Sequence, residues 1–273
     1  MKQLEVALLQ SEIDQGVQNL EDNVYPGRLI IMGLSHNRGL ALQAYALTGR
    51  SPGSKNRIFT QEGTSIRTVA PDKTPAEMAL VPNAKLIYYR ALRSSGSVHV
   101  VSNGAQTNPI FESITKGETL EEAVQSAPTV EGDVVDGVQQ APINLSEFEP
   151  DANFTPRITG VIDIREDAPT SFGLAVIRKN FETGSPIYST FETTTESIQP
   201  GVGYGIQTYN GDGDPLPSFD RDPYPYELGE GITDTAIELW EKLNSANRVA
   251  VVVRGIDLIN GNSVGTVVIN GQA

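Results

Sequence analysis

Basic residues gather in one short part of the chain. Between positions 28 and 67 there are six of them against a single acid, Glu62, in a protein of net charge −14. Three of the six are arginines that flank two apolar runs of strand length, 29–34 and 40–47: Arg28, Arg50 and Arg57. The guanidinium fork suits oxyanions such as phosphate. The stretch therefore predicts a site for a small anionic ligand, although a solvated basic face would show the same pattern.

Two further observations bear on the chemistry. Asn103 and Gly104 follow a strand-like run at 97–102, and such a pair can turn its amides toward a ligand. The chain has no cysteine and only two histidines, His36 and His99. This excludes thiolate nucleophiles and disulfides, and it argues against a histidine-rich metal site. We expect neither a metal nor a cofactor.

Composition narrows the class of protein. With 273 residues, no internal repeat and no low-complexity linker, the chain is expected to form a single domain over 1–273, with 1–24 as a helical extension. The acidic balance argues against duplex nucleic acid and anionic membranes as partners. The N-terminus is charged throughout, and no run approaches the ~20 apolar residues of a membrane span. We therefore expect a cytoplasmic location.

Hydrophobic periodicity predicts the elements that must position these groups. Helices are expected at 2–20, 109–115, 120–126 and 235–243, and irregular segments at 71–82, 127–146 and 215–230. Strands are expected at 29–34, 40–47, 58–61, 65–69, 85–92, 97–102, 158–164, 172–178, 186–193, 202–208, 248–256 and 264–269. The strands form two blocks without regular βαβ alternation. This pattern indicates an α+β fold of antiparallel sheets covered by helices.

Four short stretches occur together in this chain: YPGR at 25–28, KNR at 55–57, VVSNGAQT at 100–107 and EPDANFTPRI at 149–158. In this order and spacing the chain resembles the IMP cyclohydrolases of the archaeal type, most closely over 25–180. The resemblance implies that 5-formamidoimidazole-4-carboxamide ribonucleotide is closed to inosine monophosphate and water, in purine biosynthesis and without a cofactor. It also implies the four-layer αββα sandwich of two antiparallel sheets found in N-terminal nucleophile hydrolases.

This chain lacks the nucleophile of those hydrolases. They use a Cys, Ser or Thr with a free amine at the head of a strand. Here Tyr25, Pro26, Gly27 and Arg28 occupy that position, behind 24 other residues. We therefore expect the hydrolase-like fold without its nucleophile.

The resemblance also assigns roles to residues at matching positions. Tyr88, on the expected strand at 85–92, and Glu149 are expected to share proton transfer, with Arg28 at the reacting end of the substrate. Which of Tyr88 and Glu149 is the acid stays open. The residues expected to bind substrate are Arg57 as phosphate anchor, with Lys55, Arg50 or Arg157 beside it, and Asn103 and Gly104 at the base or formyl group.

Two other functions stay open at this point. One is a non-catalytic protein that binds purine nucleotides, and the other is an amidohydrolase of the same fold with an internal nucleophile. The helix at 2–20 precedes the usual start of the family, and the segments at 63–82, 127–147 and 209–232 look longer than in compact archaeal members. The expected partner is a small purine ribonucleotide, and we expect a homo-oligomer.

Overall fold

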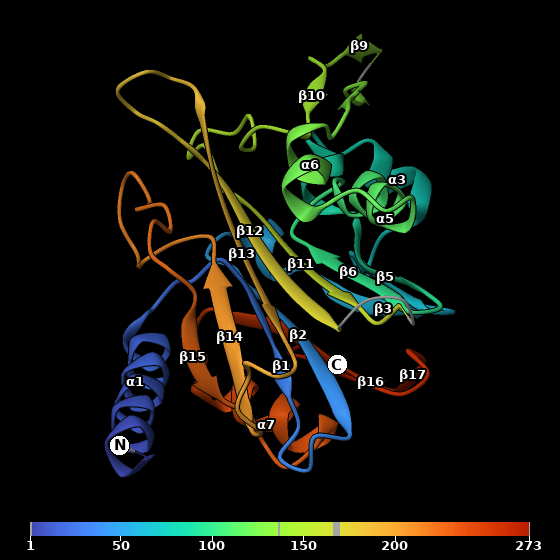
Figure 1. The fold of residues 1–273 in the computed structure, drawn as a ribbon. Coiled ribbons are helices and arrows are strands. Elements are labelled where there is room, and N and C mark those ends of the chain that lie inside the picture. The colour runs from blue at the N-terminus through green and yellow to red at the C-terminus, as the bar shows by residue number, and fades with distance from the viewer. Residues whose placement is uncertain (1, 136, 166–169, 273) are drawn as a thin grey trace.

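Two antiparallel sheets packed face to face form the centre of the molecule (Figure 1). The computed structural model describes residues 2–135, 137–165 and 170–272. In spatial order the six-stranded sheet contains β15 (Tyr224–Glu227), β14 (Val202–Gln207), β1 (Arg28–Leu34), β2 (Leu40–Thr48), β16 (Arg248–Asp257) and β17 (Ser263–Asn270). The seven-stranded sheet contains β13 (Pro186–Thr194), β12 (Ser171–Lys179), β11 (Arg157–Asp163), β6 (Val98–Ser102), β5 (Arg90–Ser95), β4 (Ser65–Val69) and β3 (Ile58–Glu62).

Helices cover the outer faces of both sheets. On the six-stranded sheet lie α1 (Lys2–Asp22) and α7 (Ile232–Lys242), and on the seven-stranded sheet lie α5 (Thr107–Thr115) and α6 (Leu120–Gln125). The remaining elements are short: α2 (Pro52–Lys55), α3 (Pro75–Ala79), α4 (Ala84–Ile87), and the strand pairs β7 (Thr129–Val130) with β10 (Ile143–Asn144) and β8 (Val134–Val135) with β9 (Val138–Gln139). The predicted α+β sandwich of antiparallel sheets is confirmed. Its likeness to N-terminal nucleophile hydrolases stays a prediction.

The alternation of side chains along β1 explains how a charged group enters the sandwich. Ile30 and Met32 face the core between the sheets, whereas Leu29 and Ile31 face the layer formed with α7. Because side chains on a strand alternate between its two faces, Arg28 shares the inner face with Ile30 and Met32. The first residue of this buried strand therefore carries its guanidinium between the two sheets.

The prediction of a strand over 85–92 is confirmed for 90–92 and wrong for the residues before them. Residues 84–87 form the short helix α4, in which the Tyr88 amide donates to the Ala84 carbonyl at 2.7 Å, and β5 begins only at Arg90. Asn83 precedes this helix with a left-handed backbone, φ 58°. Leu86 then packs in a small cluster with Ile143 and Leu145. This tertiary contact overrides the strand preference of the local sequence.

The N-terminal helix begins and ends close to its predicted limits. Of its predicted apolar face, Ile13 and Leu20 are buried, while the leucines at positions 4, 8 and 9 have side chains outside the described set. Gly16 lies directly against the backbone of Pro225, where a Cβ would be 1.9 Å from the carbonyl oxygen. The glycine that weakens helix propensity is therefore the one that lets α1 approach β15.

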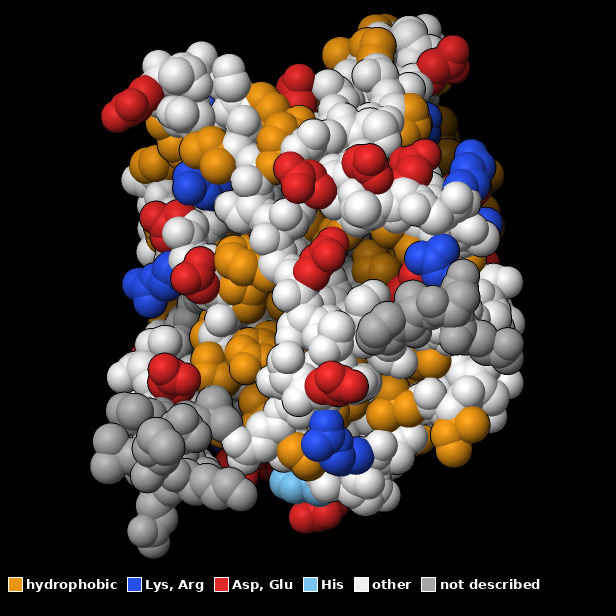
Figure 2. All heavy atoms as spheres, in the orientation of Figure 1, with side chains coloured by type: hydrophobic (Ala, Val, Ile, Leu, Met, Phe, Trp, Pro, Cys, Tyr) orange, Lys and Arg blue, Asp and Glu red, His pale blue; other side chains and the backbone are white. Residues whose placement is uncertain are grey.

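Acidic side chains are spread widely over the face of the molecule seen in Figure 2, with fewer basic ones among them. None of the helices that the structure describes is long and apolar enough to cross a membrane. The cytoplasmic location and the homo-oligomer stay predictions.

Candidate active site

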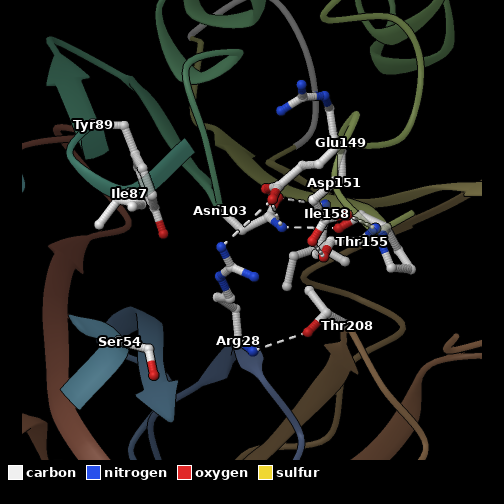
Figure 3. Close-up of polar contacts among 12 residues, drawn as sticks. Arg28, Ser54, Ile87, Tyr89, Asn103, Glu149, Asp151, Thr155, Ile158 and Thr208 are labelled. Carbon is white, nitrogen blue, oxygen red and sulfur yellow. Dashed lines mark hydrogen bonds and ion pairs between the residues drawn. The ribbon is translucent and has the colours of Figure 1, made fainter. Parts of the chain in front are cut away.

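Arg28 and Glu149 meet between the sheets. Their closest atoms, Arg28 Nη2 and Glu149 Oε2, are 3.6 Å apart, and the two side chains are only 13% and 2% exposed. Figure 3 shows the guanidinium of Arg28 extending from β1 toward the carboxylate. Burial raises the pKa of Glu149, while the charge of Arg28 opposes that rise. Burial is the largest single influence on the pKa of Arg28 and lowers it, but Glu149 and the three tyrosines Tyr89, Tyr209 and Tyr45 together raise that pKa above its ordinary value.

Gly27 fixes the direction in which Arg28 enters. Its φ is +74°, and a Cβ there would lie 2.1 Å from Thr208 Oγ1, so a side chain at this position is excluded. The same Thr208 hydroxyl accepts from the Arg28 amide at 3.1 Å, and the Thr48 amide donates to the Gly27 carbonyl at 2.8 Å. The YPGR stretch thus serves as the rigid start of a strand.

Glu149 sits on a loop that Asn103 holds in place. The amide nitrogen of Asn103 donates to the Pro156 carbonyl at 2.8 Å and lies 3.5 Å from Glu149 Oε1. Its oxygen accepts from the Ile158 amide at 2.8 Å and from Gln106 Nε2 at 3.0 Å. The loop closes on itself where the Glu149 amide donates to the Thr155 carbonyl at 2.8 Å. The polar atoms of Asn103 are therefore engaged in bracing the loop.

Three buried phenols surround the Arg28 guanidinium. The hydroxyls of Tyr45 and Tyr89 are 2.8 Å apart, so one donates to the other and the second keeps a proton for another acceptor. Tyr209 lies on the opposite side and donates to Thr155, whose hydroxyl donates to Asp151 Oδ2 at 2.6 Å. Burial raises the pKa of both Tyr45 and Tyr209, which keeps these phenols neutral.

Two further arginines are buried beside this group. Arg57 is 4% exposed and donates only to backbone carbonyls, those of Ser54 at 2.9 Å and Thr48 at 3.4 Å. Burial and then the charge of Arg28 lower the pKa of Arg57. Arg157 is 1% exposed and donates to the Glu147 carbonyl and to Gln106.

Cations therefore outnumber acids in this site. Three buried guanidiniums, those of Arg28, Arg57 and Arg157, stand against one fully buried carboxylate, that of Glu149. Two buried donors, Arg28 Nε and Arg157 Nη2, have no hydrogen-bond partner within the described chain. Buried charges are normally paired and buried donors are normally satisfied. The arrangement is therefore suited to an anionic ligand with several acceptor oxygens.

The structure separates the predicted site residues into two groups. Arg28, Glu149, Arg57, Asn103 and Arg157 come together, and Gly104 packs against Arg157, where a Cβ would lie 2.9 Å from Nη1.

The other predicted residues lie outside this cluster. Arg50 pairs with Asp212 at the surface and its guanidinium lies over the Tyr25 ring. Lys55 is half-buried in the last turn of α2. Tyr88 is half-buried and lines a groove of its own, while its neighbour Tyr89 is the tyrosine that reaches Tyr45.

Sequence reasoning missed Tyr45, Tyr89, Tyr209 and Gln106. A signal existed for Tyr45, because it lies two residues before Leu47, the cross-strand partner of Arg28, and so shares its face of the sheet. Tyr209 gave no such signal, since it follows β14 and reaches the site from 181 positions beyond Arg28. Among the residues described, no three His, Asp or Glu side chains gather as a metal site.

One comparison with known proteins gives a match. A family model described as IMP cyclohydrolase-like protein matches residues 25–261. No curated protein matches the chain. The matched range begins at the YPGR stretch and includes every residue of the cluster around Arg28, whereas the whole of α1 lies before it.

Proposed function

The chain belongs to the IMP cyclohydrolase-like family, and on this premise we propose that it closes the second ring of a purine. The substrate is 5-formamidoimidazole-4-carboxamide ribonucleotide, and the products are inosine monophosphate and water. The site lies between the two sheets, around Arg28 and Glu149.

The unbalanced charge of this site is the observation that carries the proposal. A nucleotide phosphate brings close to two negative charges and several acceptor oxygens into a site whose three guanidiniums stand against the carboxylates of Glu149 and the half-buried Asp151. Arg57 is the proposed phosphate anchor, because its described hydrogen bonds go to backbone carbonyls, those of Ser54 and Thr48, and to no side chain. Charge-assisted hydrogen bonds of this kind are about twice as strong as neutral ones.

Ring closure requires proton handling and no redox step. The carboxamide nitrogen attacks the formyl carbon and a C–N bond forms. The nitrogen loses a proton and the formyl oxygen gains one. The oxygen then takes a second proton and leaves as water, and a ring nitrogen next to that carbon gives up its proton as the new C=N bond forms. The enzyme contributes orientation, a proton acceptor near the nitrogen and donors near the oxygen.

The residues around Arg28 meet these needs. Glu149, 3.6 Å from Arg28, is the proposed acceptor for the nitrogen proton. Arg28 Nε has no partner in the described chain, and it is proposed to donate to the formyl oxygen as negative charge develops there. The Tyr45 and Tyr89 pair, which keeps one hydroxyl proton free, supplies the proton that the oxygen needs to leave.

Tyr89 takes the place proposed earlier for Tyr88. Successive residues of an extended chain point to opposite faces, and here only Tyr89 points into the space between the sheets. In Figure 3 its hydroxyl lies to one side of the Arg28 guanidinium, with Ser54 and Ile87 nearby. Tyr88 caps α4, outside the strands of the sheet, and lines a groove beside α5.

The direct test is incubation with the formylated carboxamide ribonucleotide while the ultraviolet change of ring closure is followed. We expect turnover without added metal or cofactor. Arg57→Ala is expected to weaken binding of inosine monophosphate by about 1.5–3 kcal/mol and to leave binding of inosine nearly unchanged. Nucleotide binding without turnover would identify a binding protein instead, and release of a free carboxylate from an amide would identify a hydrolase.

A further inference from the structure

A second basic hollow lies on the outer face of the seven-stranded sheet. It has a volume of about 440 Å³, and its polar wall includes Arg67, Lys85, Tyr88, Arg90 and Asn108. We name it the outer groove. Helix α5 packs on this face of the sheet. Tyr89, whose hydroxyl reaches Tyr45 in the site around Arg28, also lines the outer groove, so this one residue borders both spaces.

The sheet places two arginines of the outer groove side by side. Arg67 on β4 and Arg90 on β5 are direct cross-strand partners. Like charges directly opposite each other destabilise a pair of strands. Arg67 has only a distant acid, Glu62, at 3.8 Å and on an exposed side chain. An arrangement of this kind is stabilised when an anion lies between the two guanidiniums.

Arg90 has unused hydrogen-bonding capacity. Its Nη1 donates to Asn108 Oδ1 at 2.9 Å, but its buried Nε has no partner in the described chain, and no acidic side chain there pairs with it. The acid that lines the groove, Glu112, is paired with Arg93 at 3.1 Å.

The first turn of α5 adds to the positive potential. It contributes Asn108 and Pro109 to the wall and carries no acidic residue. A helix N-terminus favours anions through its free amides and its dipole.

The remaining wall of the outer groove is apolar. Pro109, Pro128, Val130 and Leu145 line it, and the ring of Tyr88 faces the same space. The volume lies within the range of small-molecule sites, which is about 300–1,000 Å³. A ligand that fits therefore has a phosphate group at one end and a flat, largely apolar body at the other.

We propose that the outer groove binds a second phosphorylated ligand of the nucleoside monophosphate class, separately from the site between the sheets. The phosphate lies between Arg67 and Arg90, beside the first turn of α5. The base lies against Tyr88 and the proline-lined wall. We call the site around Arg28 the inner site. Tyr88 and Tyr89 are adjacent in the chain, so a ligand in the outer groove touches the residue next to Tyr89, a phenol of the inner site.

The test is calorimetric titration of the full chain with adenosine monophosphate, and with adenosine, at low salt. Arg90→Gln is expected to weaken binding of the nucleotide to the outer groove by about tenfold or more. Arg93→Gln in a Glu112→Gln background is the matched control, because it removes the same contact with Asn108 from an arginine outside the groove lining and leaves no unpaired acid in the groove wall. The control is expected to change affinity by less than about twofold.

Arg57→Ala distinguishes the two sites. It is expected to leave binding in the outer groove unchanged, whether or not the inner site binds nucleotides. Loss of all nucleotide binding in Arg57→Ala, equal effects of Arg90→Gln and Arg93→Gln, or equal affinity for adenosine would each overturn the proposal. If Arg90→Gln lowers the melting temperature, Arg67→Gln repeats the test at a side chain that is 40% exposed.

Discussion

Two buried arginines on the inner face of the six-stranded sheet have very different surroundings. Arg28 on β1 meets a carboxylate, three phenols and a second guanidinium, and its Nε is left without a partner in the described chain. Arg254 on β16 is 1% exposed and donates to Ser94 and, at 3.4 Å, to Thr266.

The surroundings of Arg254 form a closed neutral network. Ser94 donates to His99 Nδ1 at 2.8 Å, and His99 Nε2 donates to the Gly261 carbonyl at 2.8 Å. No acidic side chain of the described chain pairs with Arg254, and burial lowers its pKa to about 10. The comparison teaches that burial alone does not mark a functional arginine. Unused donors and an excess of one charge, as at Arg28, are what indicate a ligand-binding site.

Replacing Glu149 by Gln is expected to give the largest effect of four changes that probe this comparison. It keeps the shape of the side chain and removes the proposed proton acceptor beside Arg28. We expect kcat to fall by about 10³-fold, within the usual range for a general acid or base. Steady-state assays measure this, and affinity for inosine monophosphate is expected to move by less than tenfold. Turnover close to wild type would remove Glu149 from the chemistry.

The next largest effect is expected from protonation of His99, and it changes the free energy of unfolding. Burial lowers its pKa to about 4, below the ordinary value of about 6.5. The folded chain therefore holds neutral histidine, and this contribution to stability is present above pH 6.5 and is lost as pH falls through 4. The shift corresponds to about 3 kcal/mol.

Urea denaturation at pH 7, 5 and 4 measures the loss of stability due to His99. The difference between wild type and His99→Gln isolates it from other titrating groups. A constant difference across this pH range would show that His99 protonates as easily in the folded chain as in the unfolded one.

Substitutions at the adjacent residues Tyr89 and Tyr88 compare the inner side of the seven-stranded sheet with its outer side. Tyr89→Phe removes a hydroxyl that contacts Tyr45, and we expect kcat to fall by about 30-fold, the loss of one hydrogen bond to a charged transition state. Tyr88→Phe is the matched control on the other face, and its turnover is expected to stay within twofold of wild type. The opposite ranking of the two variants would restore Tyr88 as the catalytic phenol.

Arg254→Met is expected to give the smallest effect. Replacing a buried charged group by an apolar side chain of similar length is often nearly neutral. We expect the free energy of unfolding to change by about 1 kcal/mol in either direction, and turnover to stay within about twofold of wild type. Thermal denaturation and the ring-closure assay measure the two quantities. A large loss of turnover would show that the two arginines are not functionally distinct.

Much of the arrangement around Arg28 could be predicted from sequence. The alternation of 29–34 indicates a strand, and Arg28 at its start shares the face of Ile30 and Met32. The short helix α4 could not be predicted, because its local sequence is typical of a strand and Leu86 is held by residues some sixty positions away. A shift of one residue in an extended segment exchanges its two faces. Tyr88 was therefore predicted where Tyr89 lies.

The burial of Glu149 was also beyond sequence reasoning. It stands in an acidic segment that is typical of solvated surface, and its cationic partner Arg28 is 121 positions away. The side-by-side placement of Arg67 and Arg90 depends in the same way on strand register. Charges cluster in these places because distant segments of the chain pair there. That pairing cannot be inferred from the amino-acid composition.

The residues of the inner site are far apart in the sequence, and this affects how the site forms during folding. Arg28, Glu149 and Tyr209 come from three distant parts of the chain, and they meet only when β1, β11 and β14 have all paired. Contacts of such long range form slowly, because the loops between them must close first. A nascent chain therefore acquires its inner site only near the end of synthesis and folding. A nucleotide that binds there will select complete molecules and protect them from unfolding.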